Sequence, residues 1–355
     1  MRISTQTTHR NRGFDLIRLL AAVMVIYGHS AALTGATAPG CLGNSISTIG
    51  VKVFFVISGF LITRSWAGDP SLLRFVQRRV LRILPGLACI CLLSVLVLGS
   101  VFTRLRWSDY FTAAVTWQYL WNIALFPIYN LPAVFDHNTY PSAVNGSLWS
   151  LPAEVAMYVL VPVLLGRSGA KDKLAPSVCA LGITASGLWF VWLHPSAHVP
   201  VIYGSSLTSL LDAAPYFQAG MLYALLGLER YSRPILSLLM LAAAAWTVHA
   251  FGTPHGPDGS IAEMLLLLLL PFATISCGTL ALQPLRRALE AGDFSYGLYL
   301  YGFPVQQAMM AAFANQLDTV KMFALSLPIA AVCAALSWFL VERPALLLKP
   351  ARLPT

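Results

Sequence analysis

Charged side chains are scarce in this sequence. Only 10% of its 355 residues are Asp, Glu, Lys or Arg, as 23 basic and 14 acidic residues, whereas about 25% is usual in soluble proteins. These charges are too few to solvate the surface of a soluble fold of this length. Intrinsic disorder is excluded as well, because it requires few apolar residues and many charges.

The sequence also lacks a cysteine framework. No two of its six cysteines have the spacing of a metal site or a redox pair. Cys41 stands alone in a polar segment, and we expect the other five to be packing residues, because they stand inside apolar blocks. We therefore expect no bound metal and no resident cofactor. The five are Cys89, Cys91, Cys179, Cys277 and Cys333.

Apolar residues make up 57% of the chain, about 200 of its 355 residues. One membrane span takes ~20 apolar residues, so this number suffices for about ten spans. A transmembrane β-barrel requires segments in which apolar and polar residues alternate, whereas this chain has continuous apolar blocks such as 265–270. The sequence therefore predicts an all-α, polytopic membrane helix bundle.

Eleven apolar blocks follow one another along the chain. The block at 110–126 differs from the others because Trp117, Gln118, Trp121 and Asn122 give it the composition of a membrane interface. We predict that this block lies in the interface or re-enters, and that the other ten cross the membrane. The blocks are 14–33, 49–63, 83–102, 110–126, 147–165, 176–193, 207–227, 234–251, 260–282, 294–313 and 321–340.

The net charge of +9 indicates orientation rather than nucleic-acid binding, because cytoplasmic loops of membrane proteins retain Lys and Arg. Basic and charge-poor connections alternate along the chain only if 110–126 does not change sides. We therefore predict a cytoplasmic N-terminal tail (1–13), one transmembrane domain (14–345), a cytoplasmic C-terminal tail (346–355) and an external segment at 127–146. The basic connections are 64–82, 166–175, 228–233 and 284–293, and the charge-poor ones are 35–48, 194–206 and 252–259.

The first helix carries three ionisable residues, which are expensive inside a membrane and are functional candidates by default. Asp15 and Arg18 stand near its start, where an ion-paired helix-end anchor is an equally good interpretation. His29 stands eleven residues after Arg18, almost three whole turns, so both lie on one face about 16 Å apart. His29 is thus a candidate catalytic residue, and a core histidine is the alternative.

Two further polar features stand in apolar surroundings. Arg78, Arg79 and Arg82 share a helix face at i,i+3 and i,i+4 spacing, and arginines bind phosphate oxygens with paired hydrogen bonds. A topology signal is the alternative for this cluster. Glu154 stands inside a predicted span near its external end, where it is a candidate to orient His29. A structural acid is the alternative.

Together these segments resemble the integral-membrane acyltransferase family 3, whose members O-acylate bacterial surface sugars. The resemblance covers roughly 12–345 and includes Arg18 and His29 in the first helix. One departure is Gly302, where many members have a second histidine, so no role for that histidine is carried over. The resembling segments are FDLIRLLAAVMVIYGHS at 14–30, GVKVFFVISGFLIT at 50–63, RVLR at 79–82, SLWSLPAEVAMY at 147–158, SYGLYLYGFPVQQ at 295–307 and VERP at 341–344.

The resemblance implies a membrane O-acyltransferase, most often an O-acetyltransferase, of the bacterial inner membrane. Its co-substrate would be a cytoplasmic acyl-coenzyme A, whose phosphates would meet Arg18, Arg78, Arg79 and Arg82. The acceptor would be a hydroxyl of an external glycan or glycolipid. His29, supported by Glu154, would act either as general base or as covalent acyl carrier. Further support would come from Asp15, Ser58, Trp149 and Tyr296.

The external segment 127–146 carries aromatic and hydrogen-bonding groups suited to a sugar. We expect it to help select the acceptor, and an ordinary solvated loop is the alternative. The candidate residues are Tyr129, Asn130, Asp136, His137 and Tyr140.

A proton-coupled secondary transporter is the alternative function, because buried acids, a histidine and arginines suit proton transport as well. Transporters usually show two related halves with interrupted helices at corresponding places, and neither is visible here. The acceptor sugar, the acyl chain and the oligomeric state are not specified by the sequence.

Overall fold

The structure, a computed structural model, describes residues 12–166, 174–192, 201–251, 260–280 and 292–350. Helices dominate it, as the continuous apolar blocks predict. Of the predicted tails, only residues 12–13 and 346–350 lie among the described residues. Most of the basic connections 166–175 and 284–293, most of the charge-poor connection 194–206 and all of the charge-poor connection 252–259 lie outside them. The first half contains α1 (Arg12–Leu33), β1 (Gly40–Cys41), β2 (Asn44–Ser45), α2 (Ile46–Gly68), α3 (Leu72–Leu93), η1 (Ser94–Gly99), α4 (Ser100–Phe102), α5 (Trp107–Thr112), α6 (Ala114–Gln118) and η2 (Tyr119–Ala124).

The second half is also helical. Its elements are η3 (Gly146–Trp149), α7 (Ser150–Leu165), α8 (Leu174–Trp192), β3 (Val201–Ile202), β4 (Ser205–Ser206), α9 (Leu207–Leu226), η5 (Leu228–Tyr231), α10 (Pro234–Phe251), α11 (Ser260–Gly278), α13 (Ser295–Ala312), α14 (Thr319–Ser337), η6 (Trp338–Glu342) and α15 (Arg343–Leu347).

Six helical stretches are long and apolar enough to cross a membrane in the part of the chain that the structure describes. The other blocks predicted to cross are helices too, so the all-helical membrane architecture is confirmed, whereas the count of about ten crossings stays a prediction. The six stretches are Arg12–Leu33, Ile46–Gly68, Leu72–Phe102, Gly146–Leu165, Ile261–Gly278 and Thr319–Leu347.

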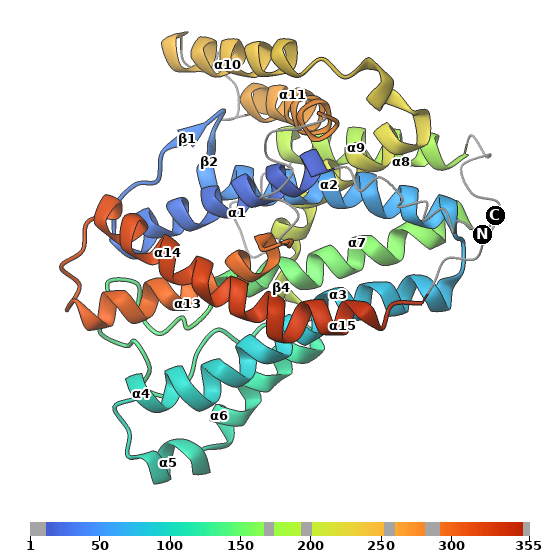
Figure 1. Cartoon of the computed structure of the whole chain (residues 1–355). Coiled ribbons are helices and arrows are strands. Elements are labelled where there is room, and N and C mark those ends of the chain that lie inside the picture. Colours follow the sequence, from blue (N-terminus) through green and yellow to red (C-terminus); the bar gives the residue numbers. More distant parts are fainter. Residues whose placement is uncertain (1–11, 167–173, 193–200, 252–259, 281–291, 351–355) are drawn as a thin grey trace, which may run out of the picture.

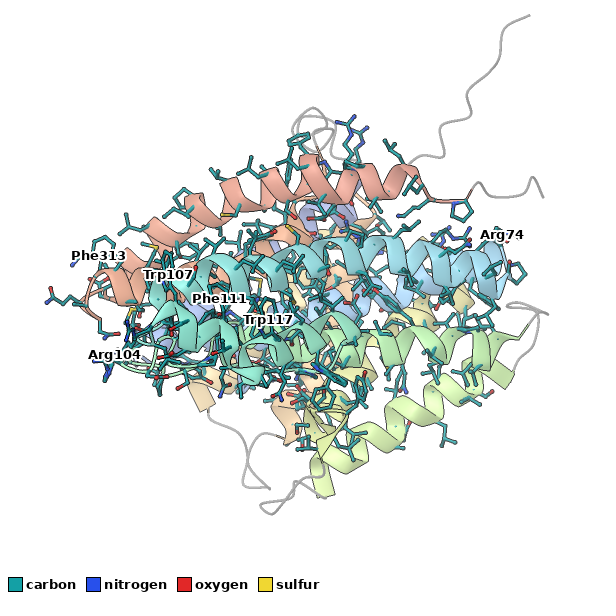
Figure 2. All side chains as sticks on the ribbon, turned by 90° about the horizontal axis from the view of Figure 1, so that it is seen from below. Arg74, Arg104, Trp107, Phe111, Trp117 and Phe313 are labelled. Carbon is teal, nitrogen blue, oxygen red and sulfur yellow. The ribbon has the colours of Figure 1, made fainter. Side chains whose placement is uncertain are left out.

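The long helices run side by side along one direction (Figure 1). The turn between α2 and α3 lies at one end of the bundle, and the turn between α13 and α14 lies at the other. In Figure 2 the first end is marked by Arg74 and the second by Arg104 and Phe313. We call them the Arg74 end and the Arg104 end. By the charge pattern, the Arg74 end is the predicted cytoplasmic end.

The block at 110–126 forms short helices rather than one long one: α5, α6 and the 3-10 helix η2. The chain leaves the Arg104 end before this block and returns to it afterwards, since Arg104 hydrogen-bonds His137 and Thr103 bridges Val134. Trp107 and Trp121 are exposed, while Tyr110 and Tyr119 are fully buried. This geometry agrees with the prediction that the block does not change sides.

Helix α2 lies at the centre of the bundle, between α1 and α9, and α13 packs against α1 and α14. The N-terminus of α2 is capped by Ser45, whose Oγ accepts a hydrogen bond from the Thr48 amide at 3.2 Å. Ser45 closes the β1–β2 hairpin, so the cap fixes where α2 begins. Helices α1, α2, α3, α7 and α13 supply most of the residues that line the largest described cavity of the bundle.

Candidate active site

A cavity of about 980 Å³ opens between α1, α2, α3, α7 and α13. Five basic and three acidic side chains line it, so its wall carries a net positive charge. Two of its basic residues, Arg64 and Lys349, come from the C-terminal part of α2 and from the end of the last described segment of the chain. The basic residues are Arg18, Arg64, Arg79, Arg82 and Lys349, and the acidic ones are Asp15, Glu154 and Asp293.

Three of the four predicted arginines meet in this cavity. Arg18 comes from α1, and Arg79 and Arg82 come from successive turns of α3. Asp293 holds two of them: its Oδ2 lies 2.6 Å from Arg82 Nη2 and 3.8 Å from Arg18 Nη1. Ser295 donates to the other Asp293 oxygen at 2.6 Å. The i,i+3 spacing of Arg79 and Arg82 therefore predicted part of this cluster, whereas no feature of the sequence indicated Asp293.

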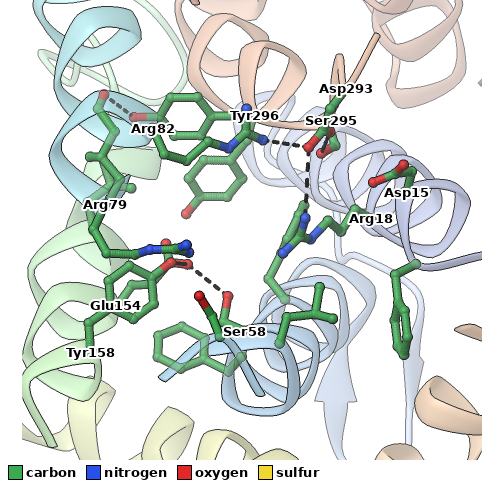
Figure 3. Close-up of a pocket in the computed structure, with 18 of the residues that line it drawn as sticks. Asp15, Arg18, Ser58, Arg79, Arg82, Glu154, Tyr158, Asp293, Ser295 and Tyr296 are labelled. Carbon is green, nitrogen blue, oxygen red and sulfur yellow. Dashed lines mark hydrogen bonds and ion pairs between the residues drawn. The ribbon is translucent and has the colours of Figure 1, made fainter. Parts of the chain in front are cut away.

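Arg79 has a different environment from Arg82. Its guanidinium lies over the Tyr158 and Phe75 rings, 5.9 Å from each centroid. Within the described part of the chain, Arg79 forms no ion pair with an acidic residue. Figure 3 shows its guanidinium on one wall of the cavity and that of Arg18 on the other. Arg79 thus leaves a positive charge available inside a cavity that is large enough for a ligand.

Arg78 is not part of the cavity wall, although we predicted that it contacts the same phosphates. It is buried at the Arg74 end, where its Nη1 lies 2.7 Å from Asp69 Oδ2. Arg74 holds the other oxygen of Asp69 at 2.6 Å. Hydrogen bonds from both arginines lower the pKa of the Asp69 carboxyl well below its usual value. Arg78 therefore closes the turn between α2 and α3.

Glu154 lies in the wall of the same cavity. Its Oε1 accepts hydrogen bonds from Ser58 on α2, at 2.9 Å, and from the Tyr158 hydroxyl one turn further along α7. Because Tyr158 also lies under Arg79, these residues join α2, α3 and α7 (Figure 3). The predicted supporting role of Ser58 thus has a structural basis, as a hydrogen-bond donor to Glu154.

His29 lies outside the cavity wall, nearer the Arg104 end. Its ring contacts Phe303 edge-to-face, with centroids 5.1 Å apart. Its Nδ1 is buried and has no hydrogen-bond partner among the described residues. The structure does not bring the His29 imidazole and the Glu154 carboxylate together, since the hydrogen bonds of Glu154 go to Ser58 and Tyr158. An unpaired nitrogen nevertheless remains available to a reacting group.

The other predicted supporting residues are placed differently from one another. Asp15 is buried and lines the cavity. Tyr296 lines it too, with its hydroxyl donating to the Ile83 carbonyl at 2.8 Å and its ring 5.3 Å from the Arg82 guanidinium carbon. Trp149 lies in η3 and packs against the hydrophobic core instead.

The segment 127–146 is a folded loop whose buried residues join the hydrophobic core of the bundle. Val134 and Val144 are fully buried, and Gln307 of α13 donates to the carbonyls of Tyr140 and Ala143 at 2.9 and 2.7 Å. The loop packs on the Arg104 end, which argues against an ordinary solvated loop. Of the residues predicted to contact an acceptor, Tyr129 is half-buried, and the exposed ones are Asn130, Asp136, His137 and Tyr140.

A second group of charges, which we did not predict from the sequence, joins α2, α9 and α11. Lys52 of α2 is 1% exposed, and its Nζ lies 2.9 Å from Asp212 of α9 and 2.5 Å from Glu263 of α11. Asn44 of the β1–β2 hairpin accepts from the same Nζ at 2.7 Å, and Tyr216 donates to Glu263 at 2.9 Å. Each charged member stands alone in an apolar block, and that signal could have revealed the group.

Gly302 stands at the position where many members of the family that the sequence resembles have a second histidine. A Cβ built on Gly302 would lie 2.8 Å from Ile26 Cγ1. The Ile26 side chain therefore fills the space that another side chain would need, and α13 approaches α1 closely at this point.

Comparison with known proteins finds one family over nearly the whole chain, described as an acyltransferase domain and matching residues 11–342. An O-acetyl transferase of Shigella phage Sf6 is 28% identical over 94% of this chain and 96% of its own length. Nodulation protein 10 of Rhizobium leguminosarum is 29% identical over 96% of this chain and 94% of its own length.

A third relative is longer than this chain. The peptidoglycan O-acetyltransferase OatA of Listeria monocytogenes is 27% identical over 84% of this chain but only 50% of its own length. No solved structure matches the chain.

Proposed function

This chain belongs to the acyltransferase family that its residues 11–342 match, and we propose that it is an O-acetyltransferase with acetyl-coenzyme A as its donor. The acceptor is a hydroxyl of a glycan or glycolipid on the external side of the bacterial inner membrane. Similarity to an O-acetyl transferase and to a peptidoglycan O-acetyltransferase supports the type of reaction. The observation that carries the proposal is the cavity in which Arg18, Arg79 and Arg82 converge.

The donor enters from the Arg74 end in this proposal. Coenzyme A carries a diphosphate and a further phosphate, and arginine binds phosphate oxygens with paired, charge-assisted hydrogen bonds. Arg79 offers a guanidinium without an acidic partner among the described residues, while Asp293 keeps Arg18 and Arg82 in position. The pantetheine arm then extends along the cavity past Tyr296 and Glu154 toward Tyr299.

Glu154 acts on the donor rather than on His29 in this arrangement. Its Oε1 is occupied by Ser58 and Tyr158, and the carboxylate lies in the cavity wall, where it can accept a hydrogen bond from a pantetheine amide. A fixed acceptor of this kind holds the arm in one register and so limits where the thioester stops.

His29 performs the chemistry next to the thioester. As general base, it removes the proton of the acceptor hydroxyl, whose oxygen attacks the carbonyl carbon while the carbon–sulfur bond breaks and the thiol leaves. As covalent carrier, it first takes the acyl group on a ring nitrogen and then passes it to the hydroxyl. The buried, unpaired Nδ1 of His29 supports either course.

The proposal is tested by turnover of the purified protein in detergent, where no gradient can drive transport. Incubation with acetyl-coenzyme A and an acceptor glycan is expected to release free thiol and acetylated glycan in equal amounts. His29→Ala is expected to lose about 100-fold or more of this activity, the usual contribution of a general acid–base residue. Wild-type protein that is folded and yet releases no thiol, or a fully active His29→Ala variant, would refute the mechanism.

A further inference from the structure

Helix α13 carries two aromatic residues one turn apart on one face, and the second of them contacts His29. Tyr299 lines the donor cavity, with its ring 5.8 Å from Phe54 and its hydroxyl bonded to Ser150 at 2.5 Å. Phe303 stands four residues further along, about 6 Å nearer the Arg104 end, and contacts the His29 ring. The cavity therefore ends one helical turn short of the level of His29.

Phe303 also contacts the loop at 127–146. Its ring centroid lies 6.2 Å from that of Tyr140, at an interplanar angle of 83°. Phe303 is 5% exposed, whereas Tyr140 is 46% exposed. A Cβ built on Gly146 would lie 2.8 Å from the Phe303 ring, so the backbone at the start of η3 closes a third side. The ring is wedged between His29, the loop and η3.

The loop is held in place against this ring. Gln307, the next helical turn of α13, is fully buried and donates to the Tyr140 carbonyl. Its own side-chain oxygen accepts from Asn138 at 2.7 Å. The loop is therefore anchored on the same helix that carries Phe303, and this anchoring fixes the contact between Tyr140 and Phe303.

We propose that Phe303 is the outer seal of the transfer site, which limits the access of external water to the partly exposed His29 side chain until an acceptor binds. This inference rests on the proposed function. A thioester beside a base is open to hydrolysis, in which water oxygen attacks the carbonyl carbon, the carbon–sulfur bond breaks and the products are a carboxylic acid and a free thiol. An acyltransferase that faces water on its acceptor side must exclude that reaction.

The access of reagents to position 29 tests the seal without any donor or acceptor. His29→Cys in a Cys41→Ser background is exposed, in intact cells, to a small, charged, membrane-impermeant methanethiosulfonate reagent. The matched control is Phe323→Ala, because Phe323 makes an equivalent edge-to-face contact with α1, at 5.1 Å from Tyr27. Each alanine variant removes one ring that contacts α1, but only the Phe303 ring also contacts the loop.

Phe303→Ala is expected to raise the labelling rate at position 29 at least 10-fold, whereas Phe323→Ala leaves it near the rate of the parent. Equal rates in the two variants would overturn the proposal. Phe303→Val gives an intermediate rate if the seal is steric, and it serves as the test variant if Phe303→Ala does not reach the membrane. Protein with His29 intact and Cys41→Ser measures the background from the remaining cysteines.

The second measurement is the coupling of thiol release to acyl transfer, in protein that keeps His29 and Cys41. The ratio of thiol released to acyl groups transferred is expected to be near one in wild type, to rise several-fold in Phe303→Ala, and to stay near one in Phe303→Leu, which keeps most of the volume. A ratio near one in Phe303→Ala, or no thiol release from a folded Phe303→Ala protein, would overturn the proposal. Since labelling needs no substrate, its outcome separates a failed seal from a failed proposed function.

Discussion

Arg78 and Arg79 are adjacent in sequence but have opposite surroundings. Arg79 faces the cavity without an acidic partner among the described residues, whereas Arg78 is buried against Asp69. Arg79→Ala is therefore expected to weaken acetyl-coenzyme A binding about 10- to 100-fold, the equivalent of about 1.5–3 kcal/mol for a hydrogen bond to a charged group. Arg79→Lys should restore the affinity only in part, because it lacks the two-pronged geometry.

Calorimetric titration of the detergent-solubilised protein with acetyl-coenzyme A measures this difference. Arg78→Ala is the matched control: it should lower the thermal stability, because it leaves Asp69 with one fewer partner, and leave the donor affinity unchanged. If Arg78→Ala weakened donor binding as much as Arg79→Ala, the cavity would not be the donor site.

Asp69 makes a contribution to stability that depends on pH. Arg74 and Arg78 lower the pKa of its carboxyl below the ordinary value of 3.8. A lowered folded-state pKa stabilises the fold above the unfolded-state pKa, and this stabilisation disappears as the pH falls through the folded-state value. Wild-type protein should therefore lose stability from about pH 5 downward.

Asp69→Asn should be less stable than wild type at pH 7 and should converge with it in acid. Melting temperatures from about pH 7 down to about pH 2 test this. The difference between the two proteins begins to shrink only near the ordinary pKa of 3.8 and shrinks further as the pH approaches the lowered folded-state pKa. Asp109→Asn is the control, because the Asp109 carboxylate accepts from the neighbouring Ser108 and lies on an exposed surface. A constant difference between Asp69→Asn and wild type across this range would contradict the assignment.

At the scale of helices, Lys52 joins α2 to α9 and α11. Lys52→Met would leave Asp212 and Glu263 close together without the cation between them, and removal of one partner of a buried pair typically costs about 3–5 kcal/mol. We expect this loss in thermal or denaturant unfolding in detergent, together with faster labelling of Cys41 in the attached hairpin.

Lys321→Met is the control for Lys52→Met. Lys321 pairs with Asp318 at 3.0 Å, but both side chains are more than half exposed, so its loss should cost about 0–1 kcal/mol. A Lys52→Met protein as stable as Lys321→Met would show that the buried group does not hold the three helices together.

Helix positions could be predicted from this sequence, because each apolar block is continuous and ends at polar or turn residues. The convergence of Arg18, Arg79 and Arg82 could be predicted in part, since two of them share a helix face. The partners of these residues could not, because Asp293 and Lys52 meet their partners across large sequence separations that no local period encodes. The separation of His29 from Glu154 has the same cause, because it depends on how α7 packs against α1 and α2.

For the whole molecule, the arrangement of the loops predicts which residues face the outside. Asn130→Cys and Tyr140→Cys, in a Cys41→Ser background, should react with an impermeant thiol reagent in intact cells. Gly68→Cys at the Arg74 end should react only after permeabilisation, because the charge pattern predicts that this end is cytoplasmic. Gly68 has open space around it, so its protection would reflect the membrane rather than packing.

Labelling of positions 130 and 140 only after permeabilisation would reverse the orientation and remove the acceptor role of the loop. It would also contradict the idea that 110–126 returns to the side from which it came, on which the alternation of basic connections depends.

The Lys52 group has a consequence for how the protein is made. Its counter-charges stand 160 and 211 residues later in the chain, at positions 212 and 263. At about 5–20 residues per second, the ribosome needs roughly 10–40 s to synthesise the intervening chain. During that interval α2 carries an ammonium group with no carboxylate beside it. Lys52 stands in the second turn of α2, close enough to the helix end for its long side chain to reach the membrane interface. The ammonium group can therefore stay hydrated at the interface until α9 and α11 are inserted and supply the carboxylates.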